Sequence, residues 1–191
     1  REIHLLERLM AEYEKVIYFS SQAVANPAAG SPYFVHKLKM ERLLLGRSES
    51  NCVVRLPQVV GFPLHNGQLV GYLIDKVIKN LSFECFEGIT RNLVHASAIR
   101  SVCETVIQSA LTGLKSFASP FEYTPKEIVS EIERATSHTA MCKMVCAESA
   151  ILDFQNVCSE DFVLIYHEME DVGRDQYISN IILGALGAYG N

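Results

Sequence analysis

The feature that most constrains the fold of this chain is the alternation of short apolar runs with segments of helical periodicity. Apolar residues recur at helical spacing over residues 2–15, and the β-branched and aromatic run Val16–Phe19 follows at once. A second apolar run, Cys52–Leu56, comes after an amphipathic segment over residues 33–45. Strands that are apolar on both faces are typical of parallel sheets covered by helices. The pattern therefore predicts an α/β fold with a parallel sheet and flanking helices.

The alternation continues along the chain. Helical periodicity predicts helices over residues 68–78 and 99–111, and short strands are expected over 83–86 and 92–95. Thr124 followed by Pro125 is typical of a helix start, with the threonine as N-cap, and this helix is expected to run to about Thr136. Residues 138–191 are interpreted as mixed helix and strand with a final helix after Asp175. The glycines of residues 184–190 have the spacing of a phosphate-binding turn, but a helix end with small residues is the favoured interpretation.

Composition excludes several classes of protein. With 191 residues, 49% of them hydrophobic and 20% charged, the chain has the make-up of one globular domain or one and a half small ones. Its formal charge of -5 leaves no broad basic surface for a phosphate backbone, so nucleic acid is not expected as a partner. No apolar run approaches the roughly 20 residues of a membrane helix. Six cysteines without a CxxC pair predict reduced core thiols in a cytoplasmic protein.

One group of polar residues suggests proton-transfer chemistry. Tyr33 and Lys37 stand four residues apart on a predicted helix, so both side chains project from the same face. A free phenol has a pKa of about 10, and a neighbouring ammonium favours the phenolate and lowers that value. Ser21 ends the preceding predicted strand, at the edge where open α/β sheets bind ligands. Tyr33 is therefore a candidate acid or base; the alternative is that Lys37 is solvated and pairs with Glu41.

At these residues the sequence resembles the extended short-chain dehydrogenase/reductase family, and within it the nucleotide-sugar epimerases, dehydratases and reductases. That family has a strand ending in Ser-Ser-x-x-Val-Tyr-Gly, then Ser-Pro-Tyr-x-x-x-Lys-x-x-x-Glu, then Val-x-Arg-x-x-x-Val-x-Gly. The same order here reads FSSQAVAN, SPYFVHKLKME and VVRLPQVVG. Gly88 to His95 is similar to the family stretch Gly-x-x-x-Arg-Asp-x-x-His. The resemblance covers most of the chain.

The resemblance implies a role for each matching residue. Ser21, Tyr33 and Lys37 match the catalytic residues, and Tyr33, Lys37 and Pro57 match positions that bind the cofactor, NAD or NADP. The residues that match substrate-binding positions are Ser21, Gln22, Gln58 and Arg91, of which Arg91 would contact the nucleotide diphosphate. No metal is implied.

The resemblance also implies an activity and an organisation. The activity is an NAD(P)-dependent oxidoreductase or epimerase of a nucleotide-sugar, in a cytoplasmic homodimer; polysaccharide biosynthesis is the family context. Residues 1–62 would form the second half of a Rossmann-type dinucleotide-binding domain, and residues 63–191 a smaller mixed α/β substrate-binding region. The family's N-terminal glycine-rich half has no counterpart ahead of residue 16, so we expect a truncated chain that is inactive alone.

Several alternatives remain open at this point. Gln22-Ala23 stands where a dehydratase has an acidic pair, which favours epimerisation or carbonyl reduction. Ala25 and Asn26 replace the family's Tyr-Gly, which fits a non-catalytic nucleotide-sugar binding or assembly module on the same scaffold. Arg55 is interpreted as a structural ion-pair partner. His138, Cys142 and Cys146 are spaced by four residues, so on one helix their side chains would align as metal ligands. This spacing is unusual for a zinc site.

Overall fold

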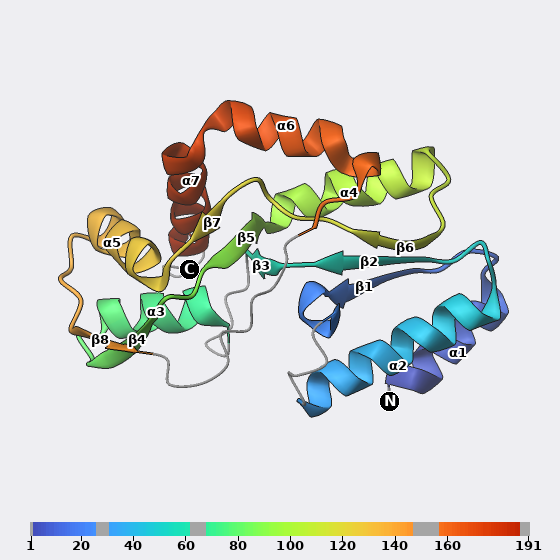
Figure 1. Ribbon diagram of the computed structural model, residues 1–191, viewed down its shortest axis with the longest axis horizontal. Coiled ribbons are helices and arrows are strands. Elements are labelled where there is room, and N and C mark those ends of the chain that lie inside the picture. Colours follow the sequence, from blue (N-terminus) through green and yellow to red (C-terminus); the bar gives the residue numbers. More distant parts are fainter. Residues whose placement is uncertain (1, 26–30, 62–67, 147–156, 188–191) are drawn as a thin grey trace. The chain divides into compact units, whose positions relative to one another are not determined.

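The computed structural model of the protein describes residues 2–25, 31–61, 68–146 and 157–187 (Figure 1). Helices and strands alternate along most of this chain, as the sequence predicts. The elements are α1 (Glu2–Glu12), β1 (Ile17–Ser21), η1 (Gln22–Ala25), α2 (Pro32–Arg47), β2 (Cys52–Leu56), β3 (Gln58–Val60), α3 (Leu69–Ile78), β4 (Phe83–Glu87), β5 (Arg91–His95), α4 (Ala96–Gln108), β6 (Gly113–Ser116), β7 (Glu122–Tyr123), α5 (Pro125–Thr136), β8 (Cys142–Cys146), η3 (Glu160–Phe162), α6 (Val163–Val172) and α7 (Arg174–Gly187).

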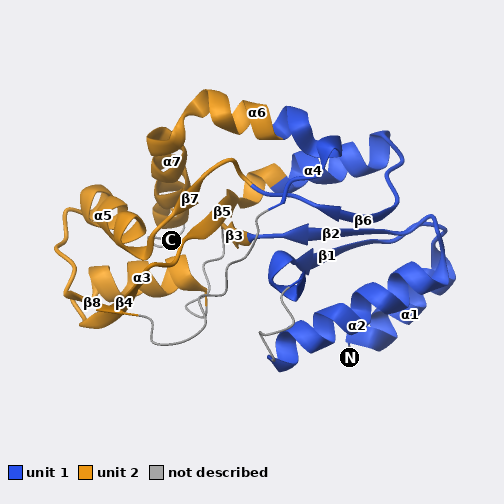
Figure 2. Cartoon of the chain, viewed as in Figure 1, with its two compact units in different colours: residues 1–57, 99–118, 154–165 blue, residues 58–98, 119–153, 166–191 orange. Residues whose placement is uncertain are grey.

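The chain forms two compact units (Figure 2). Unit 1 comprises residues 1–57, 99–118 and 154–165, and unit 2 comprises residues 58–98, 119–153 and 166–191. The sequence-based division into 1–62 and 63–191 treats each region as continuous. Each unit instead consists of several separate segments. Strand β6 pairs with β2, so residues 99–118 belong to unit 1 although they follow part of unit 2 in the sequence.

The sheet of unit 1 is parallel, with strand order β1-β2-β6. Strand β1 pairs with β2 from Ile17↔Cys52 to Ser21↔Leu56, so the two strands end at the same level. Strand β2 is almost fully buried, which agrees with its apolar sequence. The register therefore brings Ser21 and the residue after Leu56, Pro57, to the carboxyl edge of this sheet.

Helices α1 and α2 pack on the sheet of unit 1 through apolar side chains. Leu6 of α1, Met40 and Leu44 of α2, and Val53 of β2 form one buried cluster together with Val16. Burial of a side chain of this size contributes about 1.5–3 kcal/mol relative to exposure. This cluster fixes α2, the helix that carries Tyr33 and Lys37, against strand β2.

A buried ion pair reinforces the same contact. Arg55 Nη2 lies 2.7 Å from Glu41 Oε2, and Arg55 Nε donates to Glu41 Oε1 over 3.0 Å. The Glu41 side chain is only 3% exposed. The structural role predicted for Arg55 is confirmed. The alternative pairing of Lys37 with Glu41 is wrong, because Arg55 occupies both oxygens of that carboxylate.

Unit 2 contains two small sheets and the helices α3, α5 and α7. Strands β3 and β5 are parallel and β7 is antiparallel to β5, whereas β4 pairs in parallel with β8. Helix α5 begins with the predicted cap: Thr124 Oγ1 accepts from the Glu127 N–H and Glu127 Oε2 accepts from the Thr124 N–H. Fully buried side chains of this unit include Leu73, Ile74, Leu93, Ile128, Ile132, Ile181 and Ile182.

Two sequence interpretations of the later residues are changed by the structure. Cys142 and Cys146 lie on strand β8, so a helical alignment of these cysteines with His138 is wrong. The described residues hold no cluster of three or more potential metal ligands. Cys146 is exposed and only Cys52 and Cys85 are buried, so the six free thiols are not all in the core. Among the helices that the structure describes, none is both long and apolar enough to span a membrane.

Candidate active site

The carboxyl edge of the unit 1 sheet carries two neighbouring serines with different environments. Ser20 is 7% exposed, and its Oγ has no hydrogen-bond partner among the described residues. Ser21 is half-buried, and its Oγ accepts a hydrogen bond from the Ala23 N–H over 3.3 Å. Because strand residues alternate between faces, the two hydroxyls point to opposite sides of the sheet. Ser21 therefore offers the more accessible hydroxyl at the strand end.

Gln22 follows Ser21 directly but its amide is used within unit 1. Its Nε2 donates to the carbonyl of Phe117 over 2.7 Å and to the carbonyl of Val157 over 3.0 Å. The residue is 6% exposed, and its Oε1 has no partner among the residues that the structure describes. In this conformation the amide nitrogen joins the end of β1 to two later segments, at Phe117 and at Val157. Only the amide oxygen of Gln22 remains available to accept a hydrogen bond.

Tyr33 stands in the first turn of α2. Ser31 caps the helix by accepting from the Tyr33 N–H over 3.3 Å, and Pro32 occupies the first helical position, where a missing N–H costs nothing. This start places the Tyr33 side chain at the surface, 55% exposed, with its ring edge-to-face against Phe34. Figure 1 shows that α2 begins at the end of unit 1 where the arrowheads of β1 and β2 lie.

Lys37 lies one helical turn after Tyr33 and is held by residues that the sequence analysis did not single out. Its Nζ donates to the Tyr18 hydroxyl over 2.8 Å and lies 3.3 Å from Glu2 Oε1. The same Nζ lies 4.6 Å from the Tyr18 ring centroid and 5.9 Å from that of Tyr33. The predicted proximity of Lys37 to the Tyr33 ring is thus observed, but the hydrogen bonds of the ammonium go to Tyr18 and Glu2.

The environment of this group shifts the pKa values of Lys37, Glu2 and Tyr18. Burial opposes the charged form of Lys37, but the hydrogen bonds to Tyr18 and Glu2 outweigh it and raise the pKa of the ammonium. Burial likewise opposes ionisation of Glu2, whereas hydrogen bonds from His36, Tyr18 and Lys37 lower the pKa of its carboxyl group overall. Burial raises the pKa of Tyr18 to about 12. At neutral pH the group therefore consists of an ammonium, a carboxylate and a neutral phenol.

The remaining candidate residues lie on unit 2. Gln58 begins β3 and is half-buried, in register with Leu93 of β5. Arg91 begins β5 and donates from Nη1 to the Thr90 carbonyl over 2.9 Å. Burial lowers the pKa of the Arg91 guanidinium, and no carboxylate of the described residues forms an ion pair with it. A half-buried cation without an anion is a suitable contact for a phosphate group.

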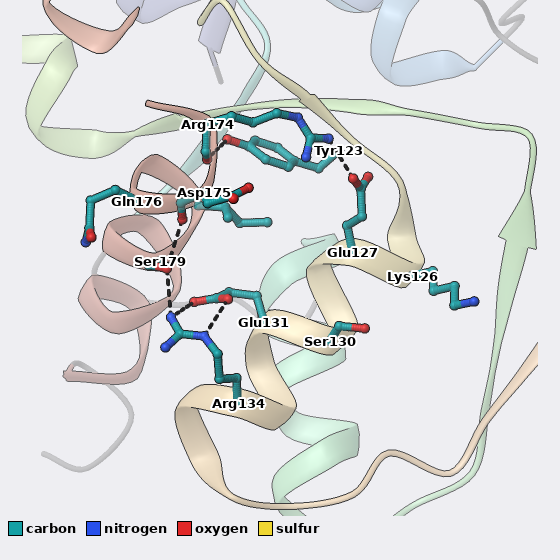
Figure 3. A pocket seen from close by; sticks show the side chains of 11 residues that line it. Tyr123, Lys126, Glu127, Ser130, Glu131, Arg134, Arg174, Asp175, Gln176 and Ser179 are labelled. Carbon is teal, nitrogen blue, oxygen red and sulfur yellow. Dashed lines mark hydrogen bonds and ion pairs between the residues drawn. The ribbon is translucent and has the colours of Figure 1, made fainter. Parts of the chain in front are cut away.

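Unit 2 also contains an open cavity of about 640 Å³ between α5 and α7 (Figure 3). Its charged side chains are largely paired with one another: Arg174 with Glu127 over 2.7 Å, and Arg134 with Glu131. Arg174 also stacks on Tyr123, 4.7 Å from the ring centroid. None of the candidate site residues from the sequence analysis lines this cavity. The Arg174–Glu127 pair and the hydrogen bond from Arg134 to Ser179 join α5 to α7, so we assign the cavity no ligand.

Comparison with known proteins gives different results for sequence and structure. No protein-family model matches the sequence, and no curated protein matches it either. Solved structures do match. A dTDP-glucose 4,6-dehydratase from Bacillus anthracis, in complex with NAD, superimposes with a TM-score of 0.74 at 14% identity, over 98% of this chain and 66% of that one. The chain therefore shares the Rossmann-like α/β fold of this structure.

Two further structures with this fold are similar. A UDP-glucose 4-epimerase from Thermus thermophilus, in complex with NAD, has a TM-score of 0.71 at 19% identity, over 97% of this chain and 68% of that one. The enzyme WbmG from Bordetella bronchiseptica, in complex with NAD and UDP, has a TM-score of 0.72 at 15% identity, over 98% of this chain and 64% of that one. The chain therefore spans about two thirds of the length of these solved structures.

Proposed function

We propose that the protein is an NAD(P)-dependent nucleotide-sugar oxidoreductase or epimerase in which Tyr33 exchanges a proton with a sugar hydroxyl. The observation that carries this proposal is the position of the Lys37 ammonium, 5.9 Å from the ring centroid of an exposed Tyr33 at the carboxyl edge of a parallel sheet. Open α/β sheets bind ligands at this edge. The shared fold supports the proposal, since the structures that match include NAD-dependent dehydratases and epimerases of nucleotide-sugars.

Four residues of unit 1 have a part in the proposed chemistry. A bound nicotinamide would supply the acceptor of the hydride that leaves the sugar carbon. Tyr33, as the phenolate, accepts the proton of the hydroxyl on that carbon, so that a carbonyl forms, and returns it in the reverse direction. Lys37 stabilises the phenolate by its charge and has a free N–H for the ribose of the cofactor. Ser21 would donate a hydrogen bond to the sugar oxygen, and Pro57 would be among the residues that hold the nicotinamide.

The substrate side of the proposal rests on unit 2 and on Gln22. Arg91 would pair with the diphosphate of the nucleotide-sugar, because its guanidinium is half-buried and has no carboxylate partner among the described residues. Gln58 and the free Oε1 of Gln22 would bind hydroxyl groups of the sugar. The exposed apolar residues Leu5 of α1 and Val35 of α2 support a homodimer formed through these two helices.

Replacing the phenol tests the catalytic role. We expect Tyr33→Phe to lower turnover of UDP-glucose or dTDP-glucose with NAD by the full-length protein by about 10²–10⁴-fold, because the proton acceptor is removed. Tyr13→Phe is the matched control, since Tyr13, directly after α1, is 54% exposed and Tyr33 is 55% exposed. Equal turnover in the two variants, with both folded by circular dichroism, would contradict the proposal.

A binding measurement separates catalysis from simple recognition of the nucleotide-sugar. We expect Arg91→Met to weaken the affinity for UDP at least about tenfold by calorimetry, because a charge-assisted hydrogen bond contributes about 1.5–3 kcal/mol. Arg100→Met is the control, because Arg100 is exposed and paired with Glu104. If Arg91→Met loses UDP while Tyr33→Phe leaves every reaction unchanged, the non-catalytic binding module is the correct function.

A further inference from the structure

Four polar side chains from three elements of unit 1 form one connected network. Glu2 of α1 accepts on Oε1 from the Tyr18 hydroxyl of β1 over 2.9 Å, and its Oε2 lies 2.7 Å from His36 Nε2 of α2. Lys37 of α2 donates to the Tyr18 hydroxyl over 2.8 Å and pairs with Glu2 Oε1 over 3.3 Å. Neither Glu2 nor Tyr18 belongs to the motif that singles out Tyr33 and Lys37 in the sequence.

The direction of these hydrogen bonds orients the ammonium. Tyr18 gives its own proton to Glu2, so its oxygen is free to accept from Lys37. An ammonium has three N–H groups, and this arrangement uses two of them. The third has no acceptor among the residues that the structure describes. Because the same Nζ lies 4.6 Å from the Tyr18 ring centroid and 5.9 Å from that of Tyr33, the network fixes Lys37 next to the Tyr33 ring.

The network also balances a charge that burial makes unfavourable. The Lys37 side chain is only 16% exposed, and an ammonium taken from water loses hydration free energy unless an anion compensates for it. Glu2 is the only carboxylate within ion-pair distance of Lys37 among the described residues. His36 contacts the other Glu2 oxygen, so Lys37 and His36 share one carboxylate.

We propose that Glu2 and Tyr18 are positioning residues for Lys37: the carboxylate and the phenol keep the ammonium charged and hold it beside Tyr33. The proposal rests on the function proposed above, because it assigns a purpose to the position of Lys37. It adds that the helix α1 completes the catalytic group, although α1 itself carries no residue that would touch substrate or cofactor.

The test follows the titration of Lys37 in the absence of any ligand. The protein is labelled with ¹³C and ¹⁵N in lysine, and the chemical shifts of Cε and Nζ are recorded against pH, with Lys37→Arg identifying the signal. We expect Glu2→Gln to move the midpoint of Lys37 to lower pH, because a neutral amide does not compensate for the buried charge. Glu7→Gln is the matched control: Glu7 lies on the same helix, half-exposed, and pairs with the exposed His4 at 3.3 Å.

Tyr18→Phe provides a second, independent variant. It keeps the aromatic ring beside the ammonium but removes the hydroxyl that links Lys37 to Glu2, so we expect a shift in the same direction. Coincident Lys37 titrations in the wild type, Glu2→Gln and Tyr18→Phe would overturn the proposal. If circular dichroism shows that Glu2→Gln is unfolded, the Lys37 titration in Tyr18→Phe alone decides whether the positioning role holds.

A second readout links the network to cofactor binding. The affinity of the full-length protein for NADH, measured by fluorescence against pH, should fall at alkaline pH as Lys37 loses its proton, and this fall should begin at lower pH in Glu2→Gln than in Glu7→Gln. Identical pH profiles would contradict the positioning role. A complete lack of NADH binding by all variants would instead contradict the proposed function, because the lysine titration needs no cofactor.

Discussion

A single ion pair, between Arg55 of β2 and Glu41 of α2, joins helix α2 to the sheet of unit 1. We expect Arg55→Met to destabilise the protein by about 3 kcal/mol or more, because it leaves the 3% exposed Glu41 side chain as an uncompensated buried charge. Urea unfolding followed by circular dichroism measures the change. The double variant Arg55→Met, Glu41→Met should recover much of the loss, since it removes both charges. Equal stability of the single and double variants would contradict this account.

At the residue scale, the sequence predicts some residues of the candidate site and misses others for a physical reason. Tyr33 and Lys37 share a helix, so the four-residue spacing is sufficient to predict that their side chains are close. The contact of Lys37 with Glu2 joins residues 35 positions apart and depends on how α1 packs beside α2. Local periodicity contains no such information. It suggests Glu41 as a partner of Lys37, but the Ser20↔Arg55 register places Arg55 where it binds that carboxylate.

At the element scale, helix α5 depends on its capping box. We expect Thr124→Ala to destabilise the protein by about 1 kcal/mol in urea unfolding at pH 7, because the Glu127 N–H loses its acceptor. Ser130→Ala, at an exposed position in the same helix, should be neutral or slightly stabilising. A Thr124→Ala variant as stable as Ser130→Ala would contradict a structural role for the cap.

The cap also predicts a pH dependence of stability. Hydrogen bonds from Thr124, from the backbone first and then the side chain, and the ion pair with Arg174 lower the pKa of the Glu127 carboxyl group below its usual 4.5. The carboxylate therefore stabilises the folded state above pH 4.5, and this contribution is lost as the pH falls through the lower, folded-state pKa. The stability difference between the wild type and Glu127→Gln should accordingly shrink as the pH falls below that usual value. A difference that stays constant throughout the acid range would contradict this linkage.

Most elements are predictable from the sequence where their periodicity is strong. The apolar strands β1 and β2 and the long amphipathic helices fall close to their expected bounds, because burial on one or both faces sets the pattern. The strands β6 and β7 contain Lys115 and Glu122 and are short, so their sequences have no clear alternation. Strand β8 is missed because its cysteines also fit a helical spacing, and only pairing with β4 decides between the two.

At the scale of the whole molecule, the outer surface of α1 and α2 predicts self-association. Val35 is 63% exposed on α2, and Leu5 is 55% exposed on α1. We propose that these residues lie in a homodimer interface, so Val35→Glu should convert dimer to monomer in sedimentation velocity. Ile107→Glu on α4 is the control, because Ile107 is 64% exposed but lies on a different helix. A wild-type monomer at micromolar concentration would contradict the proposed dimer.

The most direct test of the central claim is the appearance of a product signal in the NMR spectrum of the sugar when NAD and UDP-glucose or dTDP-glucose are added to the full-length protein, because an epimerase returns its hydride and accumulates no reduced nicotinamide. Our account predicts that this signal appears with the wild type and with Tyr13→Phe, and that Tyr33→Phe abolishes it. The signal reports hydride transfer from the sugar carbon, for which proton removal by Tyr33 is required. A signal of equal size in Tyr33→Phe, or none with any protein and any nucleotide-sugar, would contradict the account.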